Sequence, residues 1–204
     1  MDHQQITLRN AIPEFNEGIY FARYLNSAAE GFFRFMLGRR YEEIIAKAYI
    51  QPHHDLSYEN LIFAELDGII VGMFSGYTAE QHRLASKRVL KDAAGRWNVR
   101  MLIVSVVFAP LLRIIDSITD EDFYLQAIAV ETSLQGKGIG SKLMNSVEDL
   151  ARKRGAKRLA LDVSAKNANA RQLYERRGFS IESTWPKHFS IRAFEFHRMI
   201  KQLD

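Results

Sequence analysis

The apolar and polar positions of the chain follow two periods, one typical of strands and one typical of helices. Residues 6–12 alternate apolar and polar side chains, as a half-buried strand does, and Pro13 ends the alternation. Residues 139–153 instead carry apolar side chains every three or four positions, which is typical of an amphipathic helix. By the same criteria the expected strands are 6–12, 58–66, 69–77, 123–130, 158–164, 179–185 and 194–200, and the expected helices are 14–37 (one or two), 41–49, 80–94, 101–112, 139–153 and 167–177.

The order of these elements predicts the fold class. Asp67-Gly68 joins two expected strands, and this dipeptide between apolar runs is a strong β-hairpin signal. Later strands alternate with helices, so we expect an α/β (α+β mixed) fold, with a mixed central sheet of about seven strands flanked by helices. The length of 204 residues suggests a single domain, residues 1–204, in which 79–119 form a helical insertion between the third and fourth strands.

The insertion contains an uncharged and mostly apolar run, residues 101–112. A membrane-spanning helix needs about 18 or more such residues, so no membrane partner is expected. We interpret the run as a buried or partner-facing helix. Packing in the core, a homodimer interface and a lid over a substrate site are the alternatives, and all three stay open at this point.

Composition limits the chemistry that the chain can perform. It has no cysteine, which excludes disulfides, zinc–thiolate sites and thiol nucleophiles. His53, His54 and Asp55 are adjacent in a loop, where converging metal ligands are rare, so we expect surface residues there and no metal site. The first five residues lack the basic and apolar segments of a signal peptide, so a cytoplasmic location is expected.

Charge points to an anionic ligand. The formal net charge is +4, from 28 basic and 24 acidic residues. The densest basic cluster, between residues 152 and 158, surrounds the end of an expected helix, where basic side chains complement the helix dipole. We therefore expect no nucleic-acid partner.

A glycine-rich loop between strand 123–130 and helix 139–153 is the main candidate for ligand binding. Its sequence is Gln135-Gly136-Lys137-Gly138-Ile139-Gly140, followed by Ser141. Three glycines at alternate positions let a ligand approach the backbone, and free N–H groups at a helix start suit a phosphate or diphosphate. The spacing fits neither a P-loop nor the dinucleotide fingerprint, because Ser141 stands where the latter needs its third glycine.

Gln135, Gly138 and Gly140 have the Gln-x-x-Gly-x-Gly spacing that resembles the coenzyme A loop of the GCN5-related N-acetyltransferases (GNAT). A second block, residues 161–179, is similar to the other hallmark region of that family. The resemblance covers about residues 123–180 and implies the GNAT fold with acetyl-CoA as cosubstrate. It also implies acetyl transfer to a primary amine, either a small molecule or a protein lysine or N-terminus. The alternative is a coenzyme A-binding sensor or interaction protein without catalysis.

The resemblance also assigns the cofactor contacts. The backbone of Ile128, Ala129 and Val130 would pair with the pantetheine arm like an added strand, because strand 158–164 is expected to diverge from it. The Val130 N–H would polarise the thioester carbonyl. The amides of the loop would bind the diphosphate, and these belong to Gln135, Gly136, Lys137, Gly138, Ile139, Gly140 and Ser141. Asn167 would add a side-chain contact, although a plain helix N-cap is an equally good interpretation of this residue.

Three side chains are candidates for proton transfer. Tyr174 lies two helical turns after Asn167 and is implied as the general acid that protonates the departing thiolate, with core packing as the alternative. Asp162 and Glu131 are the candidate general bases, and a structural or surface role is an equal alternative for each. Tyr124 and Gln126 are weaker candidates for contact with the acceptor.

Overall fold

The computed structural model describes residues 5–95, 99–107, 117–185 and 195–204. Its strands are β1 (Ile6–Asn10), β2 (Leu61–Leu66), β3 (Ile69–Thr78), β4 (Asp122–Val130), β5 (Arg158–Ser164), β6 (Ser180–Trp185) and β7 (Phe196–Gln202). Its α-helices are α1 (Phe15–Ala28), α2 (Phe32–Leu37), α3 (Tyr41–Tyr49), α4 (Ala79–Leu84), α5 (Val89–Ala94), α6 (Val99–Val107), α8 (Ile139–Lys153) and α9 (Ala168–Arg176). Short 3₁₀ turns are η1 (Gly38–Arg40), η2 (Tyr58–Asn60) and η4 (Thr132–Leu134).

The seven strands form one sheet in the order β1-β2-β3-β4-β5-β7-β6. Neighbouring strands are antiparallel except β4 and β5, which are parallel. The predicted hairpin joins β2 to β3, and Asp67 and Gly68 have φ angles of 52° and 77°, as a type I′ turn requires. The prediction of a mixed sheet with a helical insertion between its third and fourth strands is confirmed.

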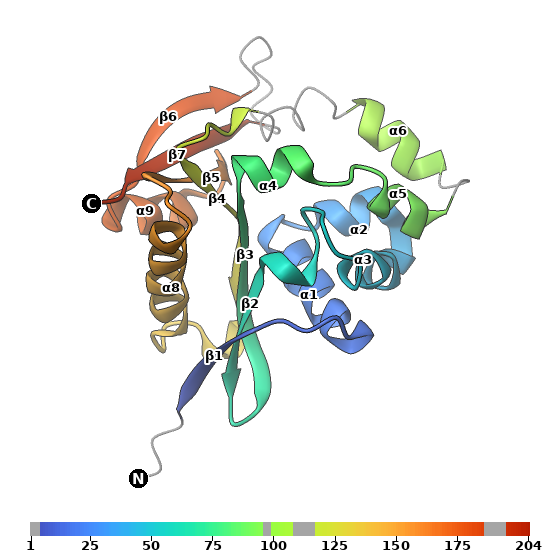
Figure 1. The fold of residues 1–204 in the computed structure, drawn as a ribbon, viewed down its shortest axis with the longest axis horizontal. Helices are drawn as coiled ribbons and strands as arrows, with labels where there is room; N and C mark the ends of the chain where they lie inside the picture. The colour runs from blue at the N-terminus through green and yellow to red at the C-terminus, as the bar shows by residue number, and fades with distance from the viewer. Residues whose placement is uncertain (1–4, 96–98, 108–116, 186–194) are drawn as a thin grey trace.

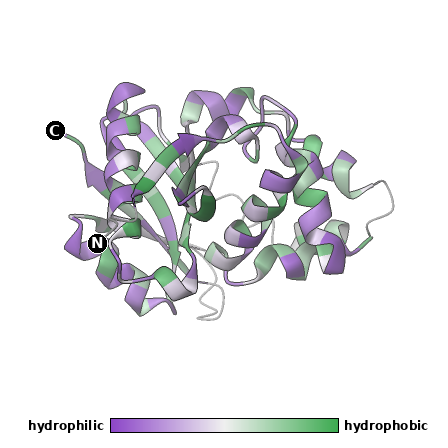
Figure 2. Ribbon diagram, turned by 90° about the horizontal axis from the view of Figure 1, so that it is seen from below, coloured by the Kyte–Doolittle hydropathy of each residue, from purple (hydrophilic) through white to green (hydrophobic). Residues whose placement is uncertain are grey.

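Helices cover both faces of the sheet (Figure 1). On one face α1 packs against α3 and against strands β3 and β4, and on the other face α8 packs against β3, β4 and β5. Adjacent strand residues point to opposite faces, so Phe63 belongs to the core cluster with α1 and Ala64 to the cluster with α8. Figure 2 shows largely hydrophobic strands in the sheet, while the surrounding helices carry both hydrophobic and hydrophilic segments.

The amphipathic helix expected at residues 139–153 is α8, with those bounds. Its buried side chains are Ile139, Leu143, Met144, Val147 and Ala151. Gly155 follows with a φ of 75°, the left-handed conformation that commonly ends a helix. Leu143 is 0% exposed, so truncating it to alanine should cost about 2–5 kcal/mol of unfolding free energy. The helix, and with it the glycine-rich loop, is therefore held firmly on the sheet.

The prediction of one helix over residues 80–94 is wrong, because the chain forms two short helices there, α4 and α5. Thr78 and Gln81 form a capping box at the start of α4, and Ala85 at its end is extended, with a ψ of 137°. The Ser86 N–H then donates to the His53 carbonyl at 2.9 Å. This bond to a distant loop takes the chain out of the helical path.

Helix α6 contains the first part of the apolar run 101–112, and the remainder lies outside the described residues. The helix packs against α2, and Val104 is buried in the cluster that includes α1 and α3. Val99, Ile103 and Val106 are 59%, 57% and 68% exposed. Core packing therefore accounts for one side of this helix only. None of the helices described in the structure is long and apolar enough to cross a bilayer.

The expected surface position of His54 is wrong, because this side chain is only 5% exposed. Its Nε2 lies 2.9 Å from the Ala48 carbonyl, and its Nδ1 accepts from the Leu56 N–H at 3.2 Å. These contacts assign the neutral tautomer with the proton on Nε2, and burial lowers the pKa of the ring. Within the described ranges no three His, Asp or Glu side chains converge as a metal site would require.

Candidate functional site

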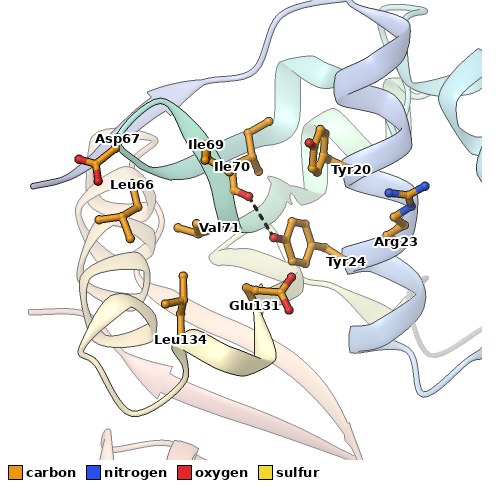
Figure 3. Close-up of a pocket in the computed structure, with 10 residues that line it drawn as sticks. All are labelled: Tyr20, Arg23, Tyr24, Leu66, Asp67, Ile69, Ile70, Val71, Glu131 and Leu134. Carbon is orange, nitrogen blue, oxygen red and sulfur yellow. Dashed lines mark hydrogen bonds between the residues drawn. The ribbon is translucent and has the colours of Figure 1, made fainter. Parts of the chain in front are cut away.

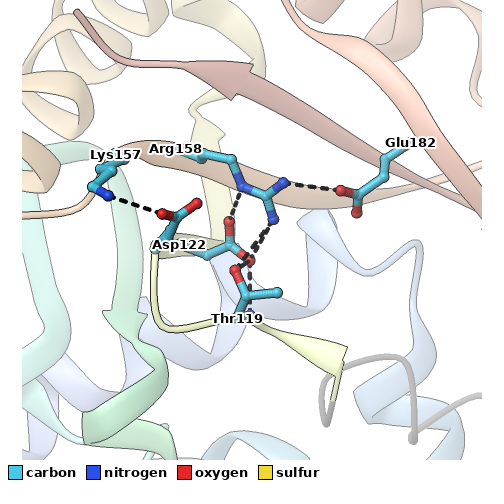
Figure 4. A network of polar contacts seen from close by, with 6 residues as sticks. Thr119, Asp122, Lys157, Arg158 and Glu182 are labelled. Atoms are coloured by element: carbon cyan, nitrogen blue, oxygen red, sulfur yellow. Dashed lines mark hydrogen bonds and ion pairs between the residues drawn. The ribbon is translucent and has the colours of Figure 1, made fainter.

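The point where β4 meets β5 is fixed by buried polar contacts (Figure 4). Asp122 and Arg158 are opposite each other in the parallel ladder, and the Arg158 Nε lies 2.8 Å from an Asp122 oxygen. The side chain of Asp122 is 1% exposed and that of Arg158 15%. Arg158 also donates to Glu182 at 3.1 Å, and the Thr119 N–H donates to Asp122 at 2.8 Å. These contacts raise the pKa of Arg158, because bonds to ionised Asp122 outweigh its burial.

Beyond this point β4 and β5 diverge. Their ladder covers only Asp122–Tyr124 and Arg158–Ala160. A bulge places Gln126 as an extra residue in β4, because the residues on either side of it pair with consecutive residues of β3. Further along, β4 stays paired with β3 and β5 with β7. The predicted divergence therefore opens along the second half of both strands.

The edge of β4 that faces this opening carries unpaired backbone groups. The Glu131 N–H donates to the Val71 carbonyl at 2.8 Å, which fixes the phase of the β3–β4 ladder. Because ladder bonds alternate along an antiparallel strand, Ala129 bonds toward β3, whereas the N–H and C=O groups of Ile128 and Val130 point away from it. Among the described residues, the N–H groups of Ile128 and Val130 and the Ile128 C=O face the opening without a protein partner, while the Val130 C=O accepts from the Gln135 side chain.

The glycine-rich loop lies at the end of the same edge. Gly136 and Gly138 have φ angles of 79° and 83°, and the space around each is open. Within the described residues, the backbone N–H groups of 136–141 donate to no protein acceptor. The Gln135 side chain folds back and donates to the Val130 carbonyl at 3.2 Å. The loop thus offers several free amides at the positive end of α8, which is the arrangement that binds phosphate groups.

Tyr174 lies on α9, and Asn167 is the N-cap that precedes this helix. The Asn167 amide oxygen caps α9 by accepting from the Ala170 N–H at 3.0 Å, and its nitrogen donates to Glu30 at 3.0 Å. Both ends of this amide therefore have protein partners. Tyr174 packs edge-on against Phe179 with ring centroids 5.6 Å apart. Burial raises the pKa of the Tyr174 phenol to about 12.

Asp162 is held in a buried ion pair. The Arg198 Nε and Nη2 atoms lie 2.6 and 2.9 Å from its two oxygens, and the Tyr124 hydroxyl donates to it at 2.9 Å. The side chains of Arg198 and Asp162 are 2% and 8% exposed. Burial raises the pKa of Asp162, while Arg198 and Tyr124 act in the opposite direction by stabilising its charge. This carboxylate is fixed in place where β4 and β5 begin to diverge.

Tyr77 adds a buried hydroxyl beside this ion pair. Its ring stacks on His82 and lies 5.6 Å from the Tyr124 ring. The side chain is 0% exposed, and its hydroxyl has no hydrogen-bond partner among the residues that the structure describes. His82 in turn contacts Asp55 at 2.8 Å.

Glu131, the other candidate base, lines a groove of about 500 Å³ between α1 and the β2–β3 hairpin (Figure 3). It directly follows β4 and is exposed to solvent. One of its oxygens accepts from the Thr132 N–H at 3.0 Å. Of the three candidate proton-transfer residues, only Glu131 is among the groove-lining residues.

Comparison with known proteins identifies the family. The model of the Acetyltransferase (GNAT) family matches residues 21–179. This chain belongs to the GNAT family. A segment of 69 residues is 39% identical to a mycothiol acetyltransferase of Beutenbergia cavernae, and it spans 34% of this chain but only 22% of that protein.

Two solved structures share the fold of this GNAT chain over nearly its whole length. The crystal structure of an acetyltransferase has a TM-score of 0.68 at 22% identity, and the match covers 97% of this chain and 100% of that one. An N-acetyltransferase from Staphylococcus aureus Mu50 has a TM-score of 0.65 at 17% identity and covers 95% and 99%. The resemblance seen in the glycine-rich loop and in residues 161–179 is thus confirmed at the level of family and fold.

One feature of this GNAT chain was not predicted from sequence. Arg198 lies opposite Asp162 in the β5–β7 ladder, a pairing that depends on the sheet order rather than on local pattern. From sequence, the aromatic residues of the first helices could line a pocket or pack in the core, and core packing is the more frequent role. Tyr20 and Tyr24 line the groove with Glu131.

Proposed function

We propose that this protein transfers an acetyl group from acetyl-CoA to a primary amine. The observation that carries the proposal is the continuity of two sets of unpaired backbone groups. In the part of the chain that the structure describes, one is the β4 edge, with the Ile128 N–H and C=O and the Val130 N–H, and the other is the row of free amides at residues 136–141. A pantetheine arm and a diphosphate are joined in one molecule and need the same two kinds of partner in the same order.

Acetyl-CoA would supply the acetyl group as a thioester. Ile128 and Val130 would bind the amide groups of its arm. The amides of 136–141 and the α8 dipole would bind the diphosphate, with exposed Lys137 adding positive charge. Asn167 would contribute mainly by capping α9 and holding Glu30, because both ends of its amide are already used.

Proton transfers must balance the reaction. The amine nitrogen bonds to the carbonyl carbon while the carbon–sulfur bond breaks. The ammonium group loses two protons in all, one before the attack and one after it. One of these is matched by the proton that the thiolate gains, and the other goes to solvent.

Glu131 is the proposed acceptor of the first proton, through water, because it is exposed on the groove. Asp162 is proposed to position Tyr124, since Arg198 holds the carboxylate in place and the Tyr124 hydroxyl donates to it. A phenol with a pKa of about 12 is a weaker acid than a thiol at about 8.5. We therefore assign Tyr174 a hydrogen bond to the departing sulfur.

The decisive experiment measures binding and turnover separately. Calorimetry with coenzyme A should show binding, and a thiol-release assay with a panel of primary amines should show turnover. Tyr174→Phe should lower turnover at least tenfold and leave coenzyme A affinity within twofold. Absence of coenzyme A binding in the native protein would refute the proposal.

A coenzyme A-binding protein without catalysis is the second candidate. It is favoured by the ion pair that fixes Asp162 and by the high pKa of Tyr174, since both reduce the capacity for proton transfer. Binding of coenzyme A with no thiol release for any amine would support this candidate.

We further propose a single-domain, cytoplasmic protein that forms a homodimer through the exposed side of α6. Light scattering of the native protein and of Ile103→Glu tests the dimer, which the charge should dissociate. A native protein that is monomeric at micromolar concentration would exclude it.

A further inference from the structure

The groove that Glu131 lines has the size and lining of a small-molecule site (Figure 3). It has a volume of about 500 Å³, within the range of ligand pockets. Helix α1 contributes the rings of Tyr20 and Tyr24, and the start of β3 contributes aliphatic side chains. The lining consists of Tyr20, Arg23, Tyr24, Leu66, Asp67, Ile69, Ile70, Val71, Glu131 and Leu134.

The uncompensated charge of this groove is negative. Arg23 is its only cation among the described residues, and its Nε donates to Glu42, outside the groove, at 3.0 Å. Glu131 has one bond, from the Thr132 N–H, which leaves its second oxygen without a partner in the described part of the chain. Asp67 lies at the opposite end, in the hairpin turn. A cation therefore complements this groove and an anion does not.

The wall around this charge is apolar and aromatic. Tyr24 is 9% exposed and its hydroxyl donates to the Ile70 carbonyl at 3.4 Å, so the ring is fixed. Burial, with the nearby Glu131 and Tyr20, raises the pKa of Tyr24 to about 12, so the phenol stays neutral. Tyr20 and Ile69 are 39% and 64% exposed, and their apolar surface is accessible to a ligand.

This lining favours an organic ammonium ion over a metal ion. Calcium and magnesium ions take about six or more oxygen ligands. Within the residues that the structure describes, no three His, Asp or Glu side chains gather in this way. An alkylated ammonium ion needs one counter-charge, and its alkyl groups pack on aromatic faces, which attract the cation. Glu131 supplies the charge and the two tyrosines supply the rings.

The groove adjoins the loop that is proposed to bind the diphosphate. Glu131 is the first residue after β4, and its carboxylate caps η4 by accepting from the Thr132 N–H at 3.0 Å. Leu134, the last residue of η4, also lines the groove, and Gln135 begins the glycine-rich loop. One short turn therefore separates the groove from the free amides of 136–141. A ligand in the groove lies at the diphosphate end of the proposed cofactor site.

The charge of Glu131 opposes the proposed diphosphate binding. The free amides, the α8 dipole and exposed Lys137 attract a diphosphate, whereas a carboxylate repels it. Two like charges about 10 Å apart at a protein surface change an equilibrium constant by about two- to tenfold at low salt. A cation bound to Glu131 removes this repulsion. The two ligands should therefore strengthen each other's binding, and by the same factor.

We propose that this groove is a regulatory site, which binds an alkylated ammonium monocation and thereby tightens the binding of coenzyme A. The charged nitrogen lies against the second oxygen of Glu131, and its alkyl groups lie against Tyr20 and Ile69. The effect on the cofactor rests on the proposed acetyl transfer from acetyl-CoA, whereas binding of the cation itself does not.

The test uses choline and its uncharged isostere 3,3-dimethylbutan-1-ol as probes. The quaternary nitrogen of choline cannot be N-acetylated, which separates this site from that of the acceptor amine. Calorimetry measures coenzyme A binding at an ionic strength of about 20 mM, with choline chloride compared against potassium chloride at equal concentration. Saturating choline should lower the Kd of coenzyme A at least threefold, and the alcohol should change it less than 1.5-fold. An alcohol effect equal to that of choline, or no choline effect, would overturn the proposal.

Variants locate the cation. Glu131→Gln keeps an oxygen for the Thr132 N–H but removes the charge, so it should tighten coenzyme A by about the factor that choline gives and no longer respond to choline. Tyr20→Ala should keep the native affinity without choline and need at least threefold more choline for half the effect. Glu80→Gln, an exposed carboxylate on α4, is the matched control and should behave as the native protein. A full choline response in Glu131→Gln would refute the assignment.

The regulatory site can fail independently of the transfer reaction. Binding is measured in place of turnover, because Glu131 is also the proposed proton acceptor and its substitution changes turnover for that reason. If coenzyme A binds with the same affinity with and without choline, the regulatory site is wrong and the cofactor proposal stands. If choline binds to the native protein and not to Glu131→Gln, while coenzyme A does not bind at all, the cation site stands and the proposed transfer is refuted.

Discussion

The buried pair of Asp162 and Arg198 gives the sharpest prediction for stability. Arg198→Met would remove a guanidinium whose side chain is 2% exposed and would leave Asp162 with the Tyr124 hydroxyl as its remaining described partner. Removing one member of a buried ion pair costs about 3–5 kcal/mol, because the other charge stays buried without compensation. For a chain of this size that corresponds to about 6–20 °C in melting temperature.

The assay is urea unfolding followed by circular dichroism, with two comparisons. Arg83→Met removes an arginine from a pair in which the side chains are 59% and 76% exposed, and it should cost at most about 1 kcal/mol. In Arg198→Met combined with Asp162→Leu neither charge of this pair remains, so most of the lost stability should return. A loss below about 1 kcal/mol in the single variant would refute the view that Arg198 compensates Asp162.

The pH dependence of this variant checks the cause. Burial raises the pKa of Asp162 above its unfolded value, and Arg198 opposes that rise. Without Arg198 the folded-state pKa should rise further, so the folded protein binds a proton more readily than the unfolded chain does. Stability of the variant should therefore recover as the pH falls toward about 5. A penalty that is the same at pH 5 and pH 8 would point to lost packing instead.

Three further predictions concern single positions. Gly138→Ala should weaken coenzyme A binding at least tenfold, because Gly138 has a φ of 83°, which L side chains rarely adopt. Gly140→Ala should change this affinity less than threefold, because an added Cβ would have its nearest neighbouring atom at 3.9 Å. Equal effects of the two variants by calorimetry would contradict this. Tyr77→Phe should leave the unfolding free energy unchanged or raise it by about 1 kcal/mol, because the Tyr77 hydroxyl has no partner among the described residues. Tyr124→Phe should lower the unfolding free energy by about 1–3 kcal/mol, because it removes the bond to Asp162. A clear loss of stability in Tyr77→Phe would mean that the Tyr77 hydroxyl has a partner. Because burial lowers the pKa of His54, native stability should fall as the pH drops below about 6.5, and the fall should be shallower in His54→Gln; parallel pH profiles would exclude this residue as the cause.

Local pattern predicted much of the fold. β5 has the predicted bounds, 158–164, because its apolar residues alternate, and α8 has them because its apolar residues repeat every three or four positions. The prediction of one helix over residues 80–94 was wrong because the break at Ala85 depends on a hydrogen bond from the Ser86 N–H to a distant loop. Distant contacts of this kind leave no periodic signal in the sequence.

The candidate site also has one part that local sequence predicts and another part that depends on distant contacts. The free amides of 136–141 follow from glycine spacing and a helix start, both of which are local. Arg198 could not be assigned to Asp162, because the two lie 36 residues apart and meet only when β7 pairs with β5. The groove at Glu131 depends on how α1 lies over the β2–β3 hairpin, which tertiary packing alone decides.

The short parallel ladder between β4 and β5 has a consequence for protein engineering. In the described sheet only three ladder pairs join β1–β4 to β5–β7, and the connection after α8 passes through Gly155. The strands β1–β4 and the strands β5–β7 each keep their own antiparallel ladders, so a chain cut at Gly155 should yield two fragments that reassociate. A molecule that bridges the opening would tighten their reassembly by mass action, and such a split protein would serve as a sensor for its own ligand.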